Sequence, residues 1–196
     1  MNAQKKSRRD FVKKSVAIAA GISIIPRYVM GGNGFLAPSD QLTKAVIGVG
    51  GMGQGHLGYE GTKLLAICDA DGNHLANTLK KVGSDVKGYR DFRDVLARPD
   101  VDIVHIATPP HWHGIMSVMA AEAGKDVYSE KPCGITIADC QRLADTMHSK
   151  QRIFQAGTQR RSVPNFIKAI ELAHGGKLGK LHTMHASVYK PTLDNT

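Results

Sequence analysis

The sequence predicts an α/β protein built on a doubly wound parallel sheet, and two observations lead to that prediction. Short apolar segments alternate with helical segments along the chain after Leu42, which is the pattern of repeated β-α units. Residues 101–107 are apolar except for Asp102 and His105, as expected for a strand buried on both faces of a parallel sheet. The 196-residue chain is 42% hydrophobic and 22% charged, a composition typical of folded globular proteins rather than disordered ones.

The individual elements follow from the positions of apolar runs, helix caps and helix breakers. Thr136 is a good N-cap residue, while Arg98-Pro99 and Gly124 each end a helix. We expect strands over residues 45–48, 64–68, 86–89, 101–107, 127–129 and 153–156. We expect helices over residues 73–82, 91–97, 112–123, 136–149 and 163–174, and a glycine-interrupted helix that opens over residues 54–59.

The net charge of +9 is concentrated near the N-terminus. Residues 1–37 hold seven basic residues and one acidic residue, so they carry +6 and leave only +3 for the rest of the chain. So small an excess does not indicate a nucleic-acid-binding surface, and we expect no nucleic acid partner. The cysteines Cys68, Cys133 and Cys140 are too scattered for a zinc site, so we expect no metal. Cys133 and Cys140 can pair in an oxidising compartment, but their spacing does not require it.

The first residues resemble an export signal. Residues 7–13, SRRDFVK, are similar to the twin-arginine motif, with Val12 where leucine is usual. A basic start, a weakly apolar run over residues 15–25 and then Pro26 form the three-part layout of a removable leader. We therefore expect residues 1–37 to be a signal peptide for the twin-arginine translocation machinery, and the protein to be periplasmic or otherwise extracytoplasmic. An N-terminal amphipathic helix or a plain basic tail is the alternative.

A glycine-rich loop directly follows the first expected strand. Residues 48–53, GVGGMG, match the pattern G-x-G-x-x-G between a strand and a helical turn. Gly48 permits the tight turn, Gly50 lets the backbone approach a diphosphate, and Gly53 lets the helix pack closely on the strand. With Gly51 and Met52 between them, these residues predict a dinucleotide whose diphosphate lies at the start of the helix.

An acidic residue ends the second expected strand. Asp69 lies sixteen residues beyond Gly53. A carboxylate there can accept both ribose hydroxyls and would repel a 2′-phosphate, which favours NAD over NADP. Asp71 is the alternative acceptor, and either residue can instead serve only as a helix cap.

Two further segments follow expected strands, at the edge where ligands of open α/β sheets bind. These are residues 108–113, TPPHWH, and residues 130–132, EKP. Lys131 can act there in proton transfer, and Glu130 can either pair with it or fix the loop. A solvated ion pair on a surface turn is the alternative.

Together the glycine loop, Asp69, the TP-x-H-x-H segment, AGKDVYSEKP and GTQRRSVPNF resemble the Gfo/Idh/MocA oxidoreductases, in particular the exported branch with twin-arginine leaders. The resemblance covers residues 44–196. It implies a Rossmann dinucleotide-binding domain and an NAD(P)-dependent oxidoreductase that acts on a sugar or related polyol.

The resemblance also implies roles for single residues. Lys131 is implied as the catalytic residue that touches substrate. Cofactor contacts are implied for Thr108, Pro109, His113, Glu130, and Gln159 with Arg160 or Arg161.

Pro110 departs from the family pattern because Asn or Asp is common at that position. The Asp and His of the family's second domain would fall beyond Thr196, and we interpret His182 and His185 as strand residues instead.

A second domain is expected to begin near the end of the sequence. Residues 181–189, LHTMHASVY, alternate in character and predict the first strand of a different sheet. Because a lone strand is not stable, we expect a longer two-domain protein of which this chain is a part. The expected division is a leader over 1–37, the NAD(P)-binding domain over 42–160, and the start of an α+β substrate and oligomerisation domain over 161–196.

The leader and the cofactor loop together favour a tightly bound cofactor. The extracytoplasmic space offers no free NAD pool, so the cofactor must be bound before folded export and regenerated within each cycle. An NAD-dependent sugar oxidoreductase is the first hypothesis. A redox-neutral glycosidase or lyase with recycled NAD and a non-catalytic nucleotide-binding fragment are the alternatives. The resemblance implies a homo-oligomer for the full-length protein.

Overall fold

The computed structural model describes Ala37, residues 40–59 and residues 61–187. Except for Ala37, the expected leader therefore lies outside the described residues, and the expected export motif lies wholly outside them. No helix within the described ranges is long and apolar enough to cross a membrane.

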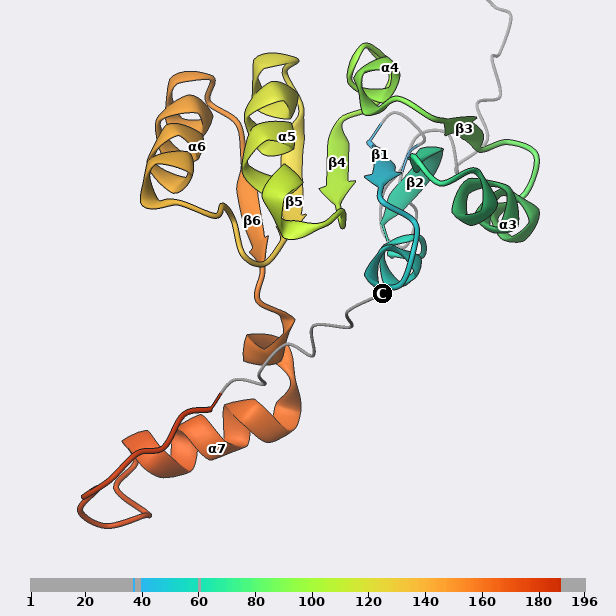
Figure 1. Cartoon of the computed structure of the whole chain (residues 1–196). Coiled ribbons are helices and arrows are strands. Elements are labelled where there is room, and N and C mark those ends of the chain that lie inside the picture. The colour runs from blue at the N-terminus through green and yellow to red at the C-terminus, as the bar shows by residue number, and fades with distance from the viewer. Residues whose placement is uncertain (1–36, 38–39, 60, 188–196) are drawn as a thin grey trace, which may run out of the picture.

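Six parallel strands form one sheet in the order β3-β2-β1-β4-β5-β6 (Figure 1). The strands are β1 (Leu42–Ile47), β2 (Thr62–Cys68), β3 (Lys87–Tyr89), β4 (Ile103–Ile106), β5 (Asp126–Glu130) and β6 (Phe154–Gly157). The chain runs outward from β1 to β3 and then returns to add β4 on the other side of β1. This arrangement confirms the doubly wound parallel sheet, and it places the topological switch point, where such sheets bind ligands, between β1 and β4.

Helices and short 3-10 turns connect the strands. The helices are α3 (Gly72–Val82), α4 (Phe92–Leu96), α5 (Pro110–Glu122), α6 (Ile137–Ser149) and α7 (Pro164–His174), and the 3-10 turns are η1 (Met52–His56) and η2 (Gln159–Ser162). The predicted cap at Thr136 is confirmed, because its hydroxyl accepts from the amide of Asp139 while the Asp139 carboxylate accepts from the amide of Thr136. Helix α7 extends away from the sheet, beyond the carboxyl end of β6 (Figure 1).

The two faces of the sheet are covered differently. On one face, α4, α5 and α6 pack over a large apolar core that includes Ala45, Ile47, Val104 and Ile106. On the other face, α3 covers a smaller cluster of buried residues: Val46, Val49, Ile67, Leu75 and Val86. Over β4 and β5, that second face carries His105 and Tyr128, whose rings pack with those of His56 and Tyr59. The helices therefore hold the sheet from both sides, while one part of it bears a polar and aromatic cluster.

Two sequence predictions are wrong in the described residues. The helix expected to open over residues 54–59 is only the 3-10 turn η1, because Gly53, Gly55 and Gly58 each weaken helix formation by about 1 kcal/mol relative to alanine. Residues 181–187 form no strand, and they are exposed. A strand needs a hydrogen-bonded neighbour, and alternation in the sequence does not supply one. Residues 188–189 of that expected strand lie outside the described residues.

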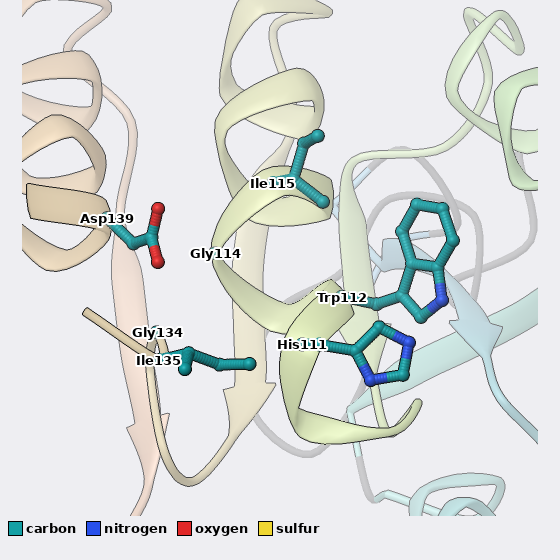
Figure 2. A pocket seen from close by; sticks show the side chains of 7 residues that line it. All are labelled: His111, Trp112, Gly114, Ile115, Gly134, Ile135 and Asp139. Carbon is teal, nitrogen blue, oxygen red and sulfur yellow. The ribbon is translucent and has the colours of Figure 1, made fainter.

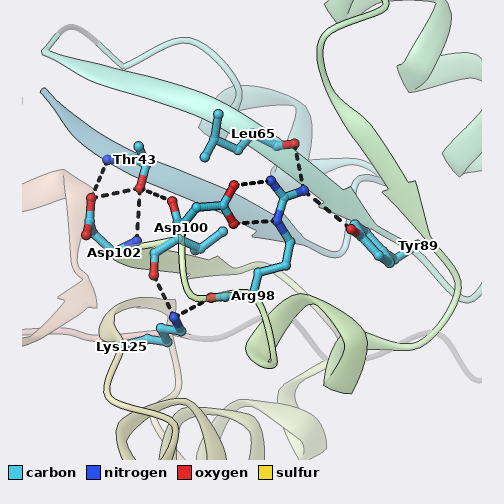
Figure 3. A network of polar contacts seen from close by, with 8 residues as sticks. Thr43, Leu65, Tyr89, Arg98, Asp100, Asp102 and Lys125 are labelled. Atoms are coloured by element: carbon cyan, nitrogen blue, oxygen red, sulfur yellow. Dashed lines mark hydrogen bonds and ion pairs between the residues drawn. The ribbon is translucent and has the colours of Figure 1, made fainter. Parts of the chain in front are cut away.

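Arg98 organises a polar network near the amino ends of the central strands (Figure 3). Its guanidinium forms two hydrogen bonds with Asp100, at 2.9 and 2.6 Å, and this pairing holds the pKa of the Asp100 carboxyl below its ordinary value. The same guanidinium donates to the carbonyl of Leu65 and to the hydroxyl of Tyr89. One side chain thus ties the loop before β4 to β2 and β3.

Lys125 and Asp102 extend the same network toward β1 and β5. The buried Lys125 ammonium donates to the carbonyls of Arg98 and Val101, at 2.5 and 2.8 Å. The Asp102 carboxylate accepts from the amide and the hydroxyl of Thr43, at 2.8 and 2.7 Å, and these bonds lower its pKa. At this edge of the sheet, the polar groups therefore satisfy one another (Figure 3).

Candidate active site

The glycine loop lies where β1 ends, and two of its glycines are required by close backbone approach. Gly48 has φ +85°, and a Cβ there would lie 2.7 Å from the carbonyl oxygen of Ala107 at the end of β4. A Cβ on Gly53 would lie 1.7 Å from the carbonyl oxygen of Gly48. Gly51 has no such neighbour within 4 Å. The loop therefore folds back on its own first residue, which leaves Gly50 and Gly51 on the cavity side.

Backbone hydrogen bonds align the loop with the ends of the neighbouring strands. The backbone amides of Gly48, Asp69 and Ala107 donate to backbone carbonyls at the ends of the neighbouring strands. The acceptors are the carbonyls of Cys68, Tyr89 and Ile47, respectively. These bonds continue the parallel ladders by one residue beyond the strands. As a result, the carboxyl ends of β1, β2 and β4 open together at one edge of the sheet.

A cavity of about 720 Å³ occupies that edge. Eight residues named as candidates from the sequence line it: Gly48, Gly50, Gly51, Met52, Asp69, Thr108, Pro109 and the alternative acceptor Asp71. Side chains that the sequence analysis did not single out also line it: His74, Arg90, Phe92, Arg93 and Trp112. Trp112 packs against Phe92 with ring centroids 6.2 Å apart. The aromatic wall comes from the starts of α4 and α5, and the exposed tryptophan directly after TPPH was the signal that could have revealed it.

Asp69 is held in place by the backbone around it. Its Oδ2 accepts from the amide of Val49 at 2.8 Å, and its Oδ1 accepts from the amide of Asp71 at 2.9 Å. A carboxylate oxygen can accept more than one hydrogen bond, so both oxygens keep acceptor capacity toward the cavity. Asp71 has a different role, because its side chain caps α3 through the amides of Asn73 and His74. These backbone hydrogen bonds lower the pKa of the Asp71 carboxyl.

His113 does not line the cavity but lies behind it. Its ring is 1% exposed, with Nε2 2.7 Å from the carbonyl oxygen of Thr108 and Nδ1 2.8 Å from that of Pro132. Both contacts are hydrogen bonds at the same time only when the ring carries a proton on each nitrogen, because both partners are acceptors. His113 thus joins the TP segment to the EKP segment, and its direct contact with a cofactor remains a prediction.

The EKP segment begins at the last residue of β5. Lys131 is exposed at the carboxyl edge of the sheet, whereas Glu130 is 4% exposed and points into the protein. Glu130 Oε1 accepts hydrogen bonds from His56 Nε2, at 3.0 Å, and from Gln159 Nε2. Glu130 therefore does not pair with Lys131 but anchors the strand end from which Lys131 projects.

Gln159 and Arg160 separate at η2. The side chain of Gln159 turns toward Glu130, while the Arg160 guanidinium lies 5.3 Å from the ring of Phe166 in α7. The structure therefore brings Gln159 to the EKP segment and directs Arg160 toward α7. The predicted cofactor contacts of both residues remain predictions.

A buried polar cluster next to the EKP segment was missed by the sequence analysis. Lys44 is fully buried, and its Nζ donates to the carbonyl of His56 at 3.0 Å and lies 4.8 Å from the ring centre of Tyr59. Burial lowers the pKa of Lys44 to about 8. Burial, together with the charge of Lys44, lowers the pKa of His105 to about 3. Lys44 and His105 each interrupt an otherwise apolar strand, and this is the sequence feature from which the cluster could have been predicted.

A second, smaller cavity of about 280 Å³ lies between the start of α5 and the segment that leads into α6 (Figure 2). It is lined by His111, Trp112, Gly114, Ile115, Gly134, Ile135 and Asp139. Asp139 is occupied in the cap of α6, so its carboxylate serves the helix rather than the cavity. In the described part of the chain, no group of three or more His, Cys, Asp or Glu side chains could hold a metal ion.

The larger cavity fits a dinucleotide. Gly50 and Gly51 line it at the start of η1, and the lack of a side chain at Gly50 lets the backbone approach a diphosphate. Asp69 offers acceptor oxygens to a ribose, and Phe92 and Trp112 offer apolar surface. These three features occur at the switch point of the sheet, as the dinucleotide-binding pattern requires.

Comparison with known sequences and structures identifies one matching family and three similar proteins. The sequence model of the oxidoreductase family with an NAD-binding Rossmann fold, Gfo/Idh/MocA, matches residues 42–158. An inositol 2-dehydrogenase of Salmonella paratyphi B is 29% identical over 154 residues, which cover 76% of this chain and 46% of that protein. A glycosyl hydrolase family 109 protein of Shewanella baltica is 32% identical over 175 residues, which cover 74% of this chain and 38% of that protein.

A protein with a similar fold is also found among solved structures. A scyllo-inositol dehydrogenase from Lactobacillus casei, solved with NAD(H) and scyllo-inositol, superimposes with a TM-score of 0.65 at 28% identity. The match covers 71% of this chain and 42% of that one. The chain therefore spans less than half the length of the relatives it matches.

Proposed function

The chain belongs to the Gfo/Idh/MocA family of oxidoreductases with an NAD-binding Rossmann fold, and we propose that it is the cofactor-binding part of an NAD-dependent enzyme acting on a sugar or related polyol. The inositol dehydrogenases among its relatives support a polyol or sugar substrate. The single observation that carries the proposal is the cavity at the switch point, where the glycine loop and Asp69 meet.

Different residues would hold the different parts of the dinucleotide. Gly50 and Gly51 would face the diphosphate, and Asp69 would accept from the adenosine ribose. Thr108 and Pro109 would face the nicotinamide half, because they follow β4 on the other side of the switch point. The bound dinucleotide would supply the two-electron acceptor or donor.

Lys131 is the residue proposed to act on the substrate. It projects from the carboxyl end of β5, on the same edge of the sheet as Thr108. Its amine can hold or release the proton of a substrate hydroxyl as the carbonyl forms or is reduced. Glu130 is buried and bonded elsewhere, so it leaves that proton to Lys131.

NAD is proposed over NADP on the position of Asp69. A 2′-phosphate would lie against a carboxylate whose two oxygens are fixed by the amides of Val49 and Asp71. Arg90 and Arg93 line the same cavity and are the groups that would favour a phosphate. Titration calorimetry with NAD and NADP decides between them, and we expect NAD to bind about tenfold more tightly or better.

Export in folded form is the proposed route to the periplasm or another extracytoplasmic space. The SRRDFVK segment supports it, and the twin-arginine translocation machinery would be the partner. The cofactor would then travel with the folded protein. Fusion of residues 1–37 to a reporter that folds only in the cytoplasm tests the route: transport that stops when Arg8 and Arg9 are both changed to lysine supports it.

A redox-neutral glycosidase is the second candidate function, and the glycosyl hydrolase family 109 relative supports it. Such an enzyme would oxidise a ring hydroxyl, lose the glycosidic group by elimination and hydration, and then reduce the carbonyl again. Release of free sugar from an aryl glycoside without net NADH would favour this function. Stoichiometric NADH from a free polyol would favour the dehydrogenase.

The cofactor-binding proposal has a direct optical test. Trp112 is the single tryptophan of the chain and lines the cavity, so bound NADH should quench its emission and take up its excitation energy. We expect a saturable signal with NADH that excess NAD reverses. Trp112→Phe should remove the signal while calorimetry still detects binding. No optical or calorimetric response to either NAD or NADP in the purified protein would overturn the proposal.

A further inference from the structure

A buried pair of side chains joins the glycine loop to the EKP segment. His56 is the last residue of η1, the turn that begins in the glycine loop, and its side chain is 3% exposed. Its Nε2 lies 3.0 Å from Oε1 of Glu130, whose side chain is 6% exposed. Glu130 directly precedes Lys131 in the sequence. Residues that are 74 positions apart along the chain are thus in contact between the two halves of the candidate site.

Each member of the pair is held by a second contact. Lys44 donates to the backbone carbonyl of His56 at 3.0 Å, which fixes the end of η1. Gln159 donates to the same Oε1 of Glu130 that His56 contacts. A Cβ on Gly157 would lie 3.0 Å from the Cα of Glu130 and 3.1 Å from its carboxyl group, so β6 leaves the carboxylate little room to move. A displacement of η1 would therefore be passed to Glu130 rather than absorbed by a loose side chain.

The hydrogen-bond chain has a defined direction. A carboxylate only accepts, so His56 must carry its proton on Nε2, which leaves Nδ1 as an acceptor in the neutral ring. His105 Nδ1 lies 3.4 Å from His56 Nδ1 and supplies the donor. His105 is neutral because burial and the nearby charge of Lys44 lower its pKa to about 3, and its one proton is then on Nδ1. The chain runs from His105 through His56 to Glu130, which specifies the orientation of each ring.

We propose that His56 and Glu130 form a mechanical link through which a diphosphate bound in the glycine loop sets the position of Lys131. His56 is thus a positioning residue that acts through Glu130, not a group that touches substrate. The inference rests on the proposed nucleotide site and adds a coupling between that site and the lysine. Because coupling is reciprocal, a change at the EKP segment would also alter the affinity of the loop for a diphosphate.

ADP is the probe for this link. It carries the adenosine and the diphosphate but lacks the nicotinamide half, so it fills the loop without the part expected to face Lys131. The 196-residue chain is saturated with ADP, as judged by calorimetry, and two quantities are followed. These are amide hydrogen exchange in the peptide over residues 128–136 and the acylation rate of Lys131 measured by peptide mass spectrometry.

Two substitutions at His56 separate the link from a general effect on the fold. His56→Gln keeps an N–H near the position of Nε2, whereas His56→Leu removes the donor at similar size. We expect ADP to slow exchange at residues 128–136 about fivefold in the natural protein and in His56→Gln, and to have no effect there in His56→Leu. The acylation rate of Lys131 should likewise change on ADP binding in the natural protein and in His56→Gln, but not in His56→Leu. A purely structural role would lower the melting temperature of His56→Leu but leave its response to ADP intact.

The outcomes discriminate clearly. An equal response to ADP in His56→Leu, or no response in the natural protein despite calorimetric binding, overturns the link and leaves the nucleotide site standing. No calorimetric binding of ADP or NAD overturns the nucleotide site and the link together. If His56→Leu does not fold, Glu130→Met takes its place, because it keeps a similar size but removes Oε1, the oxygen that accepts from His56. Loss of the ADP response in that variant supports the link, and its retention overturns it.

Discussion

The two ends of the parallel sheet use polar side chains in opposite ways. At the amino end, Arg98, Asp100 and Lys125 bond to one another or to backbone carbonyls (Figure 3). At the carboxyl end, the glycine loop and Asp69 border a cavity of about 720 Å³. Charged groups are buried at both ends, but at the carboxyl end acceptor atoms and backbone line a cavity.

The difference indicates which polar residues serve folding and which are available for a ligand. A network that is closed on itself stabilises the fold, because each buried group has its partner already. A loop shaped by close backbone contacts next to a cavity adds little to stability and is suited to hold something else. Substitutions at the amino end should therefore alter stability, and those at the carboxyl end should alter nucleotide affinity.

The largest effect is expected at Gly53. Gly53→Ala would place a Cβ 1.7 Å from the carbonyl oxygen of Gly48, so the loop must move away from the shape that holds a diphosphate. We expect the affinity for NADH to fall about 100-fold, which corresponds to about 3 kcal/mol. Titration of Trp112 fluorescence measures it.

Gly51→Ala is the matched control for Gly53→Ala. A Cβ at Gly51 meets nothing within 4 Å, and its φ of −55° suits alanine. Affinity should stay within about twofold of the natural protein. Equal losses in the two variants would show that close approach does not explain the glycine pattern.

At the opposite end, Lys125→Met should reduce stability without a change in affinity. The substitution keeps much of the buried chain but leaves the carbonyls of Arg98 and Val101 without their donor. We expect the free energy of unfolding to fall by about 2 kcal/mol. Urea denaturation checks this, with Lys80→Met, at an exposed position on α3, as the control. A large loss of NADH affinity in Lys125→Met would contradict the division between the two ends.

Asp69→Asn should have a smaller effect, restricted to the cofactor. One carboxylate oxygen would be replaced by an NH₂ group, which donates only and so accepts neither from a backbone amide nor from a ribose hydroxyl. We expect NAD to bind about tenfold more weakly, about 1.4 kcal/mol, and the preference over NADP to narrow. Asp71→Asn tests the alternative acceptor: asparagine is also a good N-cap, so affinity should hardly change if Asp71 only caps α3. The opposite ranking would assign the ribose to Asp71.

The smallest effect is a pH dependence that arises from His105, on the second face of the sheet. Its pKa is about 3 in the folded protein and 6.5 for the free side chain. Between pH 3 and pH 6.5, His105 therefore binds a proton in the unfolded chain but not in the folded protein. Stability should therefore fall as the pH drops below 6.5, with about 1 kcal/mol lost to this residue by pH 5.5. In His105→Gln, the decline between pH 7 and pH 5.5 should be shallower by that amount. The exposed His148→Gln should retain the natural slope, and an unchanged slope in His105→Gln would refute the assignment.

Much of the fold could be predicted because local patterns encode it. The strand that ends before Asp69 and the helix capped by Thr136 both appear where hydrophobic runs and cap residues predict them. The same reasoning failed for residues 54–59, where Gly55, Gly58 and the preceding Gly53 outweigh helical spacing, and for residues 181–187, where alternation found no neighbouring strand. Local pattern is reliable where the stabilising contacts are themselves local.

The residues of the candidate site likewise differ in whether neighbouring residues were enough to predict them. The glycine loop and Asp69 were recognisable because the chemistry of a tight turn and of a carboxylate at a strand end is contained in neighbouring residues. The partners of Glu130 were not, because His56 and Gln159 reach it from η1 and η2, which are 74 and 29 residues away along the chain. His113 likewise bonds to carbonyls 5 and 19 residues away.

The order of residues was therefore enough to predict a parallel α/β sheet, a glycine-rich turn after its first strand and the family to which the chain belongs. The folded arrangement established which charged groups are closed into the Arg98 network, which border the cavity, and which connect η1 to Lys131. The reason is physical: backbone preferences act over a few residues, whereas burial and hydrogen-bond pairing depend on strands brought together from distant parts of the chain.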